Sequence, residues 1–241
     1  MKIIEKIRDR AEHPYDHRQP VIAFTGDSVT QGCFGVYAKE PGVLETYYDQ
    51  TAAYSQKVKE ILSLLYPAAN VTVVNAGISG GKAAGGLKRL ERDILSVQPD
   101  LTVVCYGLND SNQREEGLEK YATSLRGIFA KLKESGSEVI FLTPNLMTNR
   151  VDVSLKEPEA IAAAQRVAKT VNDGWPDRYI EAAKAVCKEA GVPVCDCYAL
   201  WKRLRDGGAD ITTLLANRIN HPSEKMLWMF AYELVKTMFE A

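Results

Sequence analysis

Five short apolar segments recur along the chain, and they are rich in β-branched residues. A strand with one face in water would alternate apolar and polar residues, whereas a strand covered on both faces by helices is apolar throughout. The pattern therefore predicts buried parallel strands at 21–26, 71–76, 101–107, 138–144 and 192–197.

Between these strands the apolar residues follow a helical period. The segment 51–66 carries one apolar stripe, and Pro67 follows its end as a stop signal. Gly136 ends a later helix, and Ser223 is a candidate cap for the last one. Helices are expected at 51–66, 85–97, 116–135, 158–172, 177–190 and about 223–239. The stripe in the first of them consists of Tyr54, Val58, Ile61, Leu62 and Leu65.

The alternation of strands and helices predicts an α/β fold, in which helices cover both faces of one parallel sheet. Ligands in such folds bind at the carboxyl ends of the strands. Three segments lack a periodic pattern: 33–50, 145–157 and 206–220. The first two are rich in aromatic, polar and charged residues, so we interpret them either as walls of a substrate pocket or as plain surface loops.

Length and charge narrow the possible partners. The 241 residues fit a single domain over 1–241, with a charged N-terminal extension at 1–19 that is expected to be helical. A net charge of −1 gives no overall attraction to nucleic acid or to an anionic membrane, so a small molecule is the expected partner. The chain has neither an apolar run that could span a membrane nor an apolar signal segment. We therefore expect a cytoplasmic protein, or a secreted one only if a leader was removed.

The cysteines and histidines argue against a metal site. The five cysteines are scattered, mostly through predicted strands and helices, which is unlike a disulfide framework and typical of free thiols. Cys195 and Cys197 lack the second ligand pair of a zinc site, and the chain has only three histidines. No metal and no cofactor is expected.

A serine follows closely after the end of the first predicted strand. In Gly26-Asp27-Ser28 the strand stops and a helix can begin, so the Ser28 hydroxyl would project from the edge of the sheet. The amide groups at such a junction favour developing negative charge. Taken alone, Asp27 as a turn residue and Ser28 as a helix cap would also explain these residues.

Two further strand ends carry hydrogen-bond donors. The segment "NAGISGGK" begins at Asn75, and its glycines, Gly80 among them, let the backbone approach a ligand closely. In "YGLNDSN", Asn109 supplies an uncharged amide donor of the kind found in oxyanion holes, although turn chemistry also favours it. Neither segment has the spacing of a phosphate loop or a dinucleotide fingerprint, which argues against a nucleotide-binding protein.

A serine nucleophile needs a base, and a histidine can accept its proton near neutral pH. His13 and His17 lie in the charged N-terminal extension and are expected to be solvated. His221, in "NRINHPSE" directly before the last predicted helix, remains as the candidate.

The order of these blocks from Val21 to about Phe239 resembles the SGNH hydrolase family, the GDSL-type esterases and lipases. The resemblance implies a flavodoxin-like three-layer α/β/α sandwich around a central five-stranded parallel sheet. It also implies that Ser28 is the nucleophile and His221 the general base. The implied oxyanion hole consists of the backbone N–H groups of Ser28 and Gly80 and the side-chain amide of Asn109, with Asp27 and Asn75 as supporting residues.

One departure from the family matters for mechanism. The family commonly has an aspartate three residues before the histidine, and Arg218 occupies that position here. An arginine cannot accept the Nδ1 proton of His221, whereas the carboxylate would hold the imidazole tautomer and stabilise the imidazolium. Other acceptors are open to this chain: a backbone carbonyl, the amide oxygens of Asn217 or Asn220, or the carboxylate of Asp210.

The function expected from this pattern is that of a serine esterase acting on short-chain carboxylic esters. Tyr37, Tyr47 and Tyr48 lie among charged residues and suit a sugar, which favours deacetylation of a carbohydrate, although tyrosines can also serve only for packing. Two alternatives stay open. One is a lysophospholipase or thioesterase acting on longer acyl chains, and the other, prompted by Arg218, is a catalytically impaired ligand-binding module.

Overall fold

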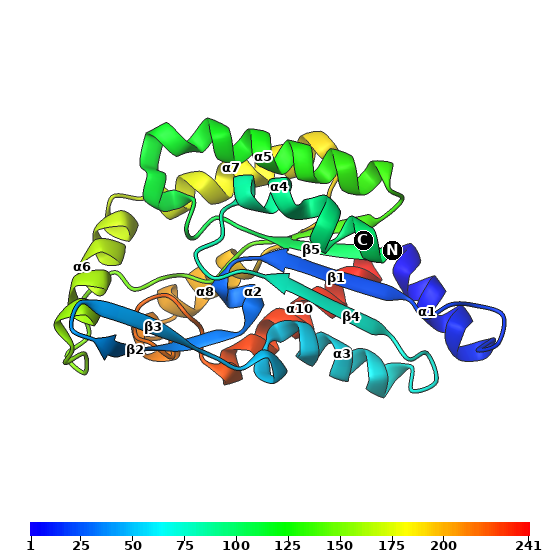
Figure 1. The fold of residues 1–241 in the computed structure, drawn as a ribbon, viewed down its shortest axis with the longest axis horizontal. Helices are drawn as coiled ribbons and strands as arrows, with labels where there is room; N and C mark the ends of the chain where they lie inside the picture. The colour runs from blue at the N-terminus through cyan, green and yellow to red at the C-terminus, as the bar shows by residue number, and fades with distance from the viewer.

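The computed structural model describes the backbone of residues 1–241 and all side chains except those of Ala38 and Leu44. Its centre is a five-stranded parallel sheet with the strand order β4-β1-β5-β6-β7 (Figure 1). This confirms the predicted α/β fold and all five strand positions, although several strands are shorter than predicted. The strands are β1 (Val21–Gly26), β4 (Thr72–Gly77), β5 (Leu101–Cys105), β6 (Glu138–Leu142) and β7 (Val194–Cys195).

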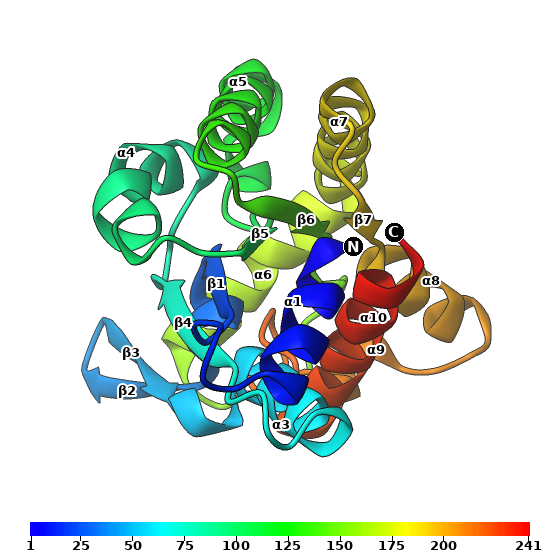
Figure 2. The same ribbon diagram turned by 90° about the vertical axis from the view of Figure 1, so that its right-hand side faces the viewer.

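Helices cover both faces of this sheet and form the outer layers of a sandwich (Figures 1 and 2). One face is covered by α4 (Ala83–Asp93), α5 (Arg114–Glu134) and α7 (Trp175–Ala190). The other is covered by α1 (Lys2–Glu12), α3 (Tyr54–Leu65), α8 (Cys197–Asp206) and α10 (Leu227–Glu240). The N-terminal extension is therefore helical, as predicted. Among the described residues, no helix combines the length and the apolar character needed to cross a bilayer.

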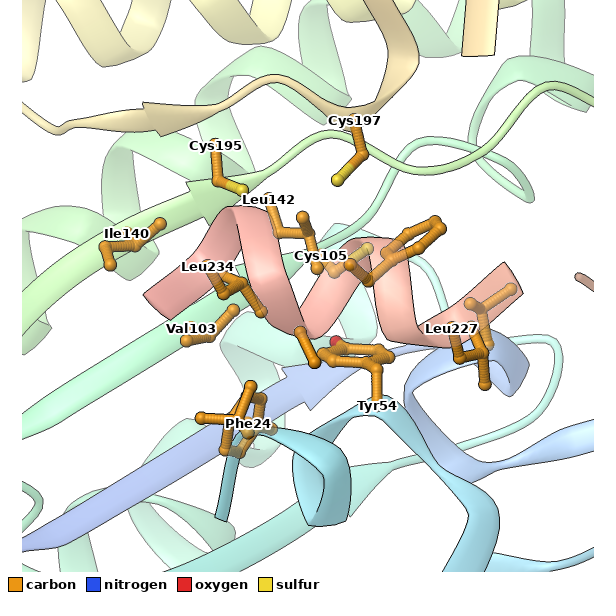
Figure 3. Packing of buried hydrophobic residues seen from close by; sticks show 14 of the residues in the cluster. Phe24, Tyr54, Val103, Cys105, Ile140, Leu142, Cys195, Cys197, Leu227 and Leu234 are labelled. Atoms are coloured by element: carbon orange, nitrogen blue, oxygen red, sulfur yellow. The ribbon is translucent and has the colours of Figure 1, made fainter. Parts of the chain in front are cut away.

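The second face is held by aromatic packing. The ring of Tyr54 lies with its centroid 5.6 Å from that of Phe24 on β1 and 5.8 Å from that of Phe230 on α10 (Figure 3). All three side chains are fully buried, and such rings contribute both apolar area and favourable ring contacts. This packing fixes β1, and hence the residues that follow it, against two helices.

The structure corrects two of the predicted segments. The segment 33–50, expected to be a loop, forms an antiparallel hairpin of β2 (Cys33–Glu40) and β3 (Val43–Tyr48), turning at Gly42 with a φ of +84°. The apolar run 192–197 is mostly not strand, because only 194–195 pair with β6, and Asp196 then accepts a hydrogen bond from the N–H of Ala199 and starts α8. The sequence pattern gave no sign of α8 or of the short helix α9 (Ile211–Leu214).

Smaller differences concern helix ends. Leu65, assigned to the buried stripe, is 51% exposed, because the stripe turns away from the sheet at the end of α3. The last helix begins at Leu227 after a 3₁₀ turn over Glu224–Met226, and the side chain of Ser223 makes no capping hydrogen bond.

The helix expected at 158–172 is found there as α6 (Pro158–Asn172). All five cysteines are free and buried, as predicted.

Candidate functional site

The predicted site residues lie at the carboxyl ends of the central strands. Gly26, the last residue of β1, is paired with Gly77 of β4 and with Cys105 of β5, so the loops after these three strands start side by side. The chain passes from β4 over β1 to β5, which makes this edge the switch point of the sheet, where such folds bind ligands. A Cβ at Gly26 would lie 2.6 Å from the carbonyl oxygen of Cys105, so this close approach requires a glycine.

Ser28 follows the turn at Asp27 and opens the four-residue helix α2 (Ser28–Gln31). One Asp27 carboxylate oxygen accepts a hydrogen bond from the N–H of Val29 at 3.0 Å, so Asp27, and not Ser28, caps this helix. The amide of Ser28 has no hydrogen-bond acceptor among the described residues. The serine N–H is therefore available to an acyl oxygen beside the hydroxyl.

The structure brings His221 to Ser28 across 193 positions of sequence. The Nε2 of His221 lies 2.9 Å from the Oγ of Ser28, and both residues are 4% exposed. This is hydrogen-bonding distance, and it is the arrangement that proton transfer from a serine hydroxyl requires.

The loop after β4 leaves one amide free. The N–H groups of Ile78 and Gly81 bond to backbone carbonyls, and that of Ser79 bonds to the side chain of Gln31. Of the amides at 78–81, only that of Gly80 has no acceptor within the described part of the chain. Gly80 adopts a φ of +73°, a left-handed conformation that favours glycine.

Asn109, after β5, ties the three loops together. Its Nδ2 lies 3.1 Å from the carbonyl oxygen of Gly81 and 3.4 Å from the Oδ2 of Asp27. The free amides of Ser28 and Gly80 and the side chain of Asn109, whose Nδ2 already faces these two acceptors, thus belong to three adjoining loops at one sheet edge. Such donors would stabilise an oxyanion formed at Ser28.

Asn75 has a structural role. Its Nδ2 donates to the carbonyl of Thr30 in α2 and to the hydroxyl of Ser55, while its Oδ1 accepts from the N–H of Gly77. These bonds fix α2 against β4, and so Asn75 supports the position of Ser28 indirectly. The sequence identified Asn75 as a supporting residue, but not which elements it joins.

Asp210 is not part of the site. One of its oxygens caps α9 by accepting from the N–H of Thr212, and the other faces the guanidinium of Arg150. The proposal that Asp210 supplies the missing carboxylate is therefore wrong, because its carboxylate is occupied by α9 and by Arg150.

Asn217 and Asn220 lie closer to His221 than Asp210 does, but neither directs an amide oxygen at the Nδ1 of His221. The Oδ1 of Asn217 accepts backbone N–H groups, and the Oδ1 of Asn220 accepts from the Nδ2 of Asn217. The ring nitrogen Nδ1 of His221 lies 3.2 Å from Asn217 Nδ2. The predicted amide-oxygen acceptor is thus replaced by an amide nitrogen.

Burial sets the protonation of His221. Removal from water lowers its pKa to about 4, and a hydrogen bond with the backbone of Phe34 acts in the opposite direction. The imidazole is therefore neutral near pH 7 and able to act as a base. A backbone hydrogen bond that raises the pKa of an imidazole favours its protonated form and therefore involves a carbonyl acceptor. A backbone carbonyl was among the acceptors that the sequence left open, but no residue type indicates that Phe34 supplies it.

Two carboxyl groups are buried behind the site. Burial is the main cause that raises the pKa of Asp27, to about 7; the hydrogen bond from Val29 opposes the rise and the nearby charge of Asp110 contributes to it. Burial likewise raises the pKa of Asp110 to about 6, and the Oδ2 of Asp110 has no hydrogen-bond partner among the described residues. Each group holds its proton to a higher pH in the folded protein than in the unfolded chain.

These shifts predict how stability depends on pH. The stabilisation from Asp27 and Asp110 is complete below about pH 4 and is lost as pH rises to about 7. His221 has the opposite effect, because its lowered pKa means that stability is lost as the pH falls from 6.5 to about 4.

Asp110→Asn keeps the acceptor for the N–H of Ala83. Between pH 5 and pH 8, we expect the free energy of unfolding of this variant to rise by about 1–3 kcal/mol relative to that of the wild type. Urea unfolding at both pH values measures this, and parallel profiles for the two proteins would contradict it.

Known proteins resemble this chain in sequence and in fold. A family model described as the GDSL-like Lipase/Acylhydrolase family matches residues 24–226. An acetylxylan esterase of Geobacillus stearothermophilus is 27% identical over 132 residues, which cover 51% of this chain and 58% of that enzyme. The chain thus matches less than two thirds of the length of this relative.

Solved structures share the fold. The structure of Axe2, an acetylxylan esterase from Geobacillus stearothermophilus, superposes with a TM-score of 0.65 at 23% identity, covering 90% of this chain and 93% of that one. A two-domain esterase active on acetylated mannans superposes with a TM-score of 0.69 at 17% identity, covering 99% of this chain and 52% of that one. At these identities the likeness establishes the common fold.

Proposed function

Because the chain belongs to the GDSL-like lipase/acylhydrolase family, we propose that it is a serine esterase that removes short acyl groups, acetyl above all, from a carbohydrate. The observation that carries this proposal is the 2.9 Å contact between Ser28 Oγ and His221 Nε2 at the switch point of the sheet. Free amides on the adjoining loops supply what acyl transfer needs besides a nucleophile and a base.

The reaction proceeds in two steps. Ser28 Oγ attacks the ester carbonyl carbon while His221 accepts the hydroxyl proton, and the N–H groups of Ser28 and Gly80 with the Asn109 amide hold the oxyanion. His221 then gives its proton to the leaving alkoxide, which leaves an acyl group on Ser28. A water molecule, deprotonated by His221, attacks this acyl-enzyme, and His221 returns the proton to Ser28 Oγ as the bond between Oγ and the acyl carbon breaks and the carboxylic acid leaves.

The β2–β3 hairpin supports a carbohydrate as the alcohol part of the substrate. Tyr37 and Tyr47 are about half exposed, and the strand register places them on one face of the hairpin together with Glu45. The hydroxyl of Tyr37 and the ammonium of Lys39 both donate to Glu45, at 2.8 and 2.6 Å. Aromatic rings beside such polar groups can stack on a sugar ring and bond to its hydroxyls.

Cys33, which is paired with Tyr48 in the hairpin, connects the hairpin to the oxyanion loop. Burial raises the pKa of the Cys33 thiol to about 12, and hydrogen bonds with the side chains of Ser79 and Tyr48 oppose this rise. Ser79 directly precedes Gly80. A substrate resting on the hairpin would therefore lie beside the oxyanion donors. The relatives named above are described as acetylxylan esterase and as an esterase active on acetylated mannans, which favours the same substrate class.

The acyl length separates this proposal from its enzymatic alternative. We expect hydrolysis of p-nitrophenyl esters to be fastest for the acetyl ester and to fall steadily from C2 to C12, and acetylated xylo-oligosaccharides to release acetate. A maximum at C8 or beyond would favour a lysophospholipase or thioesterase instead.

Covalent labelling tests the remaining alternative, a ligand-binding module. A fluorophosphonate probe should label the wild type at Ser28, because the probe needs an activated serine. A folded protein that stays unlabelled and releases no acetate would contradict the proposed activity and favour a module without catalysis.

A further inference from the structure

The side-chain amide of Asn217 has only one possible orientation. Its Oδ1 accepts three backbone N–H groups, those of Ile219 at 3.0 Å, Asn220 at 2.9 Å and His221 at 3.0 Å. Exchanging the oxygen and nitrogen of this amide would set an NH₂ group against three N–H donors. The hydrogen bonds of the turn therefore direct Nδ2 towards the imidazole.

This nitrogen can only donate. Asn217 Nδ2 donates one hydrogen to the Oδ1 of Asn220 at 2.8 Å and directs the other at the Nδ1 of His221, 3.2 Å away. The Nδ1 atom must then be the acceptor and carry no proton. In a neutral imidazole the proton is consequently on Nε2, which faces Ser28 Oγ at 2.9 Å and is then the ring N–H available to the backbone of Phe34.

We propose that Asn217 is a positioning residue that favours the resting His221 tautomer with its proton on Nε2, in which the ring accepts the Ser28 proton only after it has changed tautomer. This inference rests on the proposed function. To act as a base, His221 must lose the Nε2 proton and gain one at Nδ1, with no net change in charge. It then accepts the Ser28 proton at Nε2 and becomes an imidazolium. In the Nδ1–H tautomer and in the imidazolium, the Nδ1–H group faces an N–H group of Asn217. Because two donors face each other there, Asn217 disfavours both forms and slows the reaction.

An aspartate at position 217 would reverse this effect. One carboxylate oxygen would keep the three backbone N–H groups, and the other would accept the Nδ1–H of His221. The amide of Asn220 can turn over to donate to this second oxygen, because its Oδ1 bonds only to Asn217 among the described residues. In serine hydrolases, an amide in place of the orienting carboxylate holds the wrong tautomer and lowers turnover about 10⁴-fold. We expect Asn217→Asp to raise kcat at least tenfold.

The matched control is Asn220→Asp. It places the same charge in the same turn and keeps an oxygen acceptor for Asn217 Nδ2, but it gives His221 Nδ1 no carboxylate. A rate increase shared by both variants would point to the added charge, and not to the orientation of the ring.

Multiple-bond ¹H–¹⁵N spectra of the full chain distinguish the two tautomers without substrate. The chain has only three histidines, so His221→Gln assigns the signal. We expect Nε2–H in the wild type and in Asn220→Asp, Nδ1–H in Asn217→Asp, and a tenfold or greater rise in p-nitrophenyl acetate turnover in Asn217→Asp alone.

An Nδ1–H signal in the wild type would overturn the proposal, and so would a shifted tautomer in Asn217→Asp without faster turnover. The proposed function fails in a different way: none of the proteins would hydrolyse esters or react with a fluorophosphonate, whatever the tautomer.

Discussion

Ser28→Ala is expected to lower kcat for p-nitrophenyl acetate by at least about 10²-fold. Removing the serine of a complete triad costs about 10⁶-fold. An amide in place of the orienting carboxylate already lowers turnover about 10⁴-fold. Removing the serine from such an enzyme should therefore lower kcat by a further factor of about 10². The substitution removes one hydroxyl from a buried site and creates little void, so the thermal unfolding midpoint should stay near that of the wild type.

The control for this prediction is Ser79→Ala, which removes a side-chain hydroxyl from the neighbouring loop while leaving its backbone amide bonded to Gln31. This variant should keep turnover within about threefold of the wild type, because the proposed mechanism uses no side-chain group of Ser79. Equal turnover in Ser28→Ala and the wild type would remove Ser28 from the reaction and leave the ligand-binding alternative.

His221→Gln should cause a loss of the same size, again at least about 10²-fold in kcat. Glutamine fills a similar volume in this buried position but cannot take up the serine proton. Because nucleophile and base act as a unit, the double variant Ser28→Ala/His221→Gln should be no slower than either single variant.

Steady-state rates of the three variants, with unfolding curves as a check on folding, measure this dependence. Losses that multiply in the double variant would mean that Ser28 and His221 act independently, which the proposed mechanism does not allow.

The structure explains how Arg218 is tolerated at the position of the usual aspartate. It adopts a φ of +59°, and its guanidinium lies 3.5 Å from the carbonyl oxygen of Thr212. The preceding residue, Asn217, faces Nδ1 of His221 instead. The substitution therefore leaves the approach of His221 to Ser28 intact and changes only what its second nitrogen meets.

Several features followed from the sequence by itself. The strands and long helices were predictable because burial on one or both faces imposes a local apolar period, as in Val21–Gly26 and Pro158–Asn172. Ser28 and Asn109 could be selected because strand ends of a parallel sheet converge at one edge. His221 was selected because the other two histidines lie in the charged N-terminal extension, and Gly80 was singled out by the family resemblance. The family match and the sheet topology confirm the predicted family and fold class.

Other features were decided only in three dimensions. The hairpin over 33–48 depends on pairing across the turn, and the raised pKa values of Asp27 and Asp110 depend on burial that no motif encodes. The sequence shows an asparagine at position 217, but it does not show which end of the amide meets His221. Three backbone N–H groups decide that, and they converge on one oxygen only after the turn has folded.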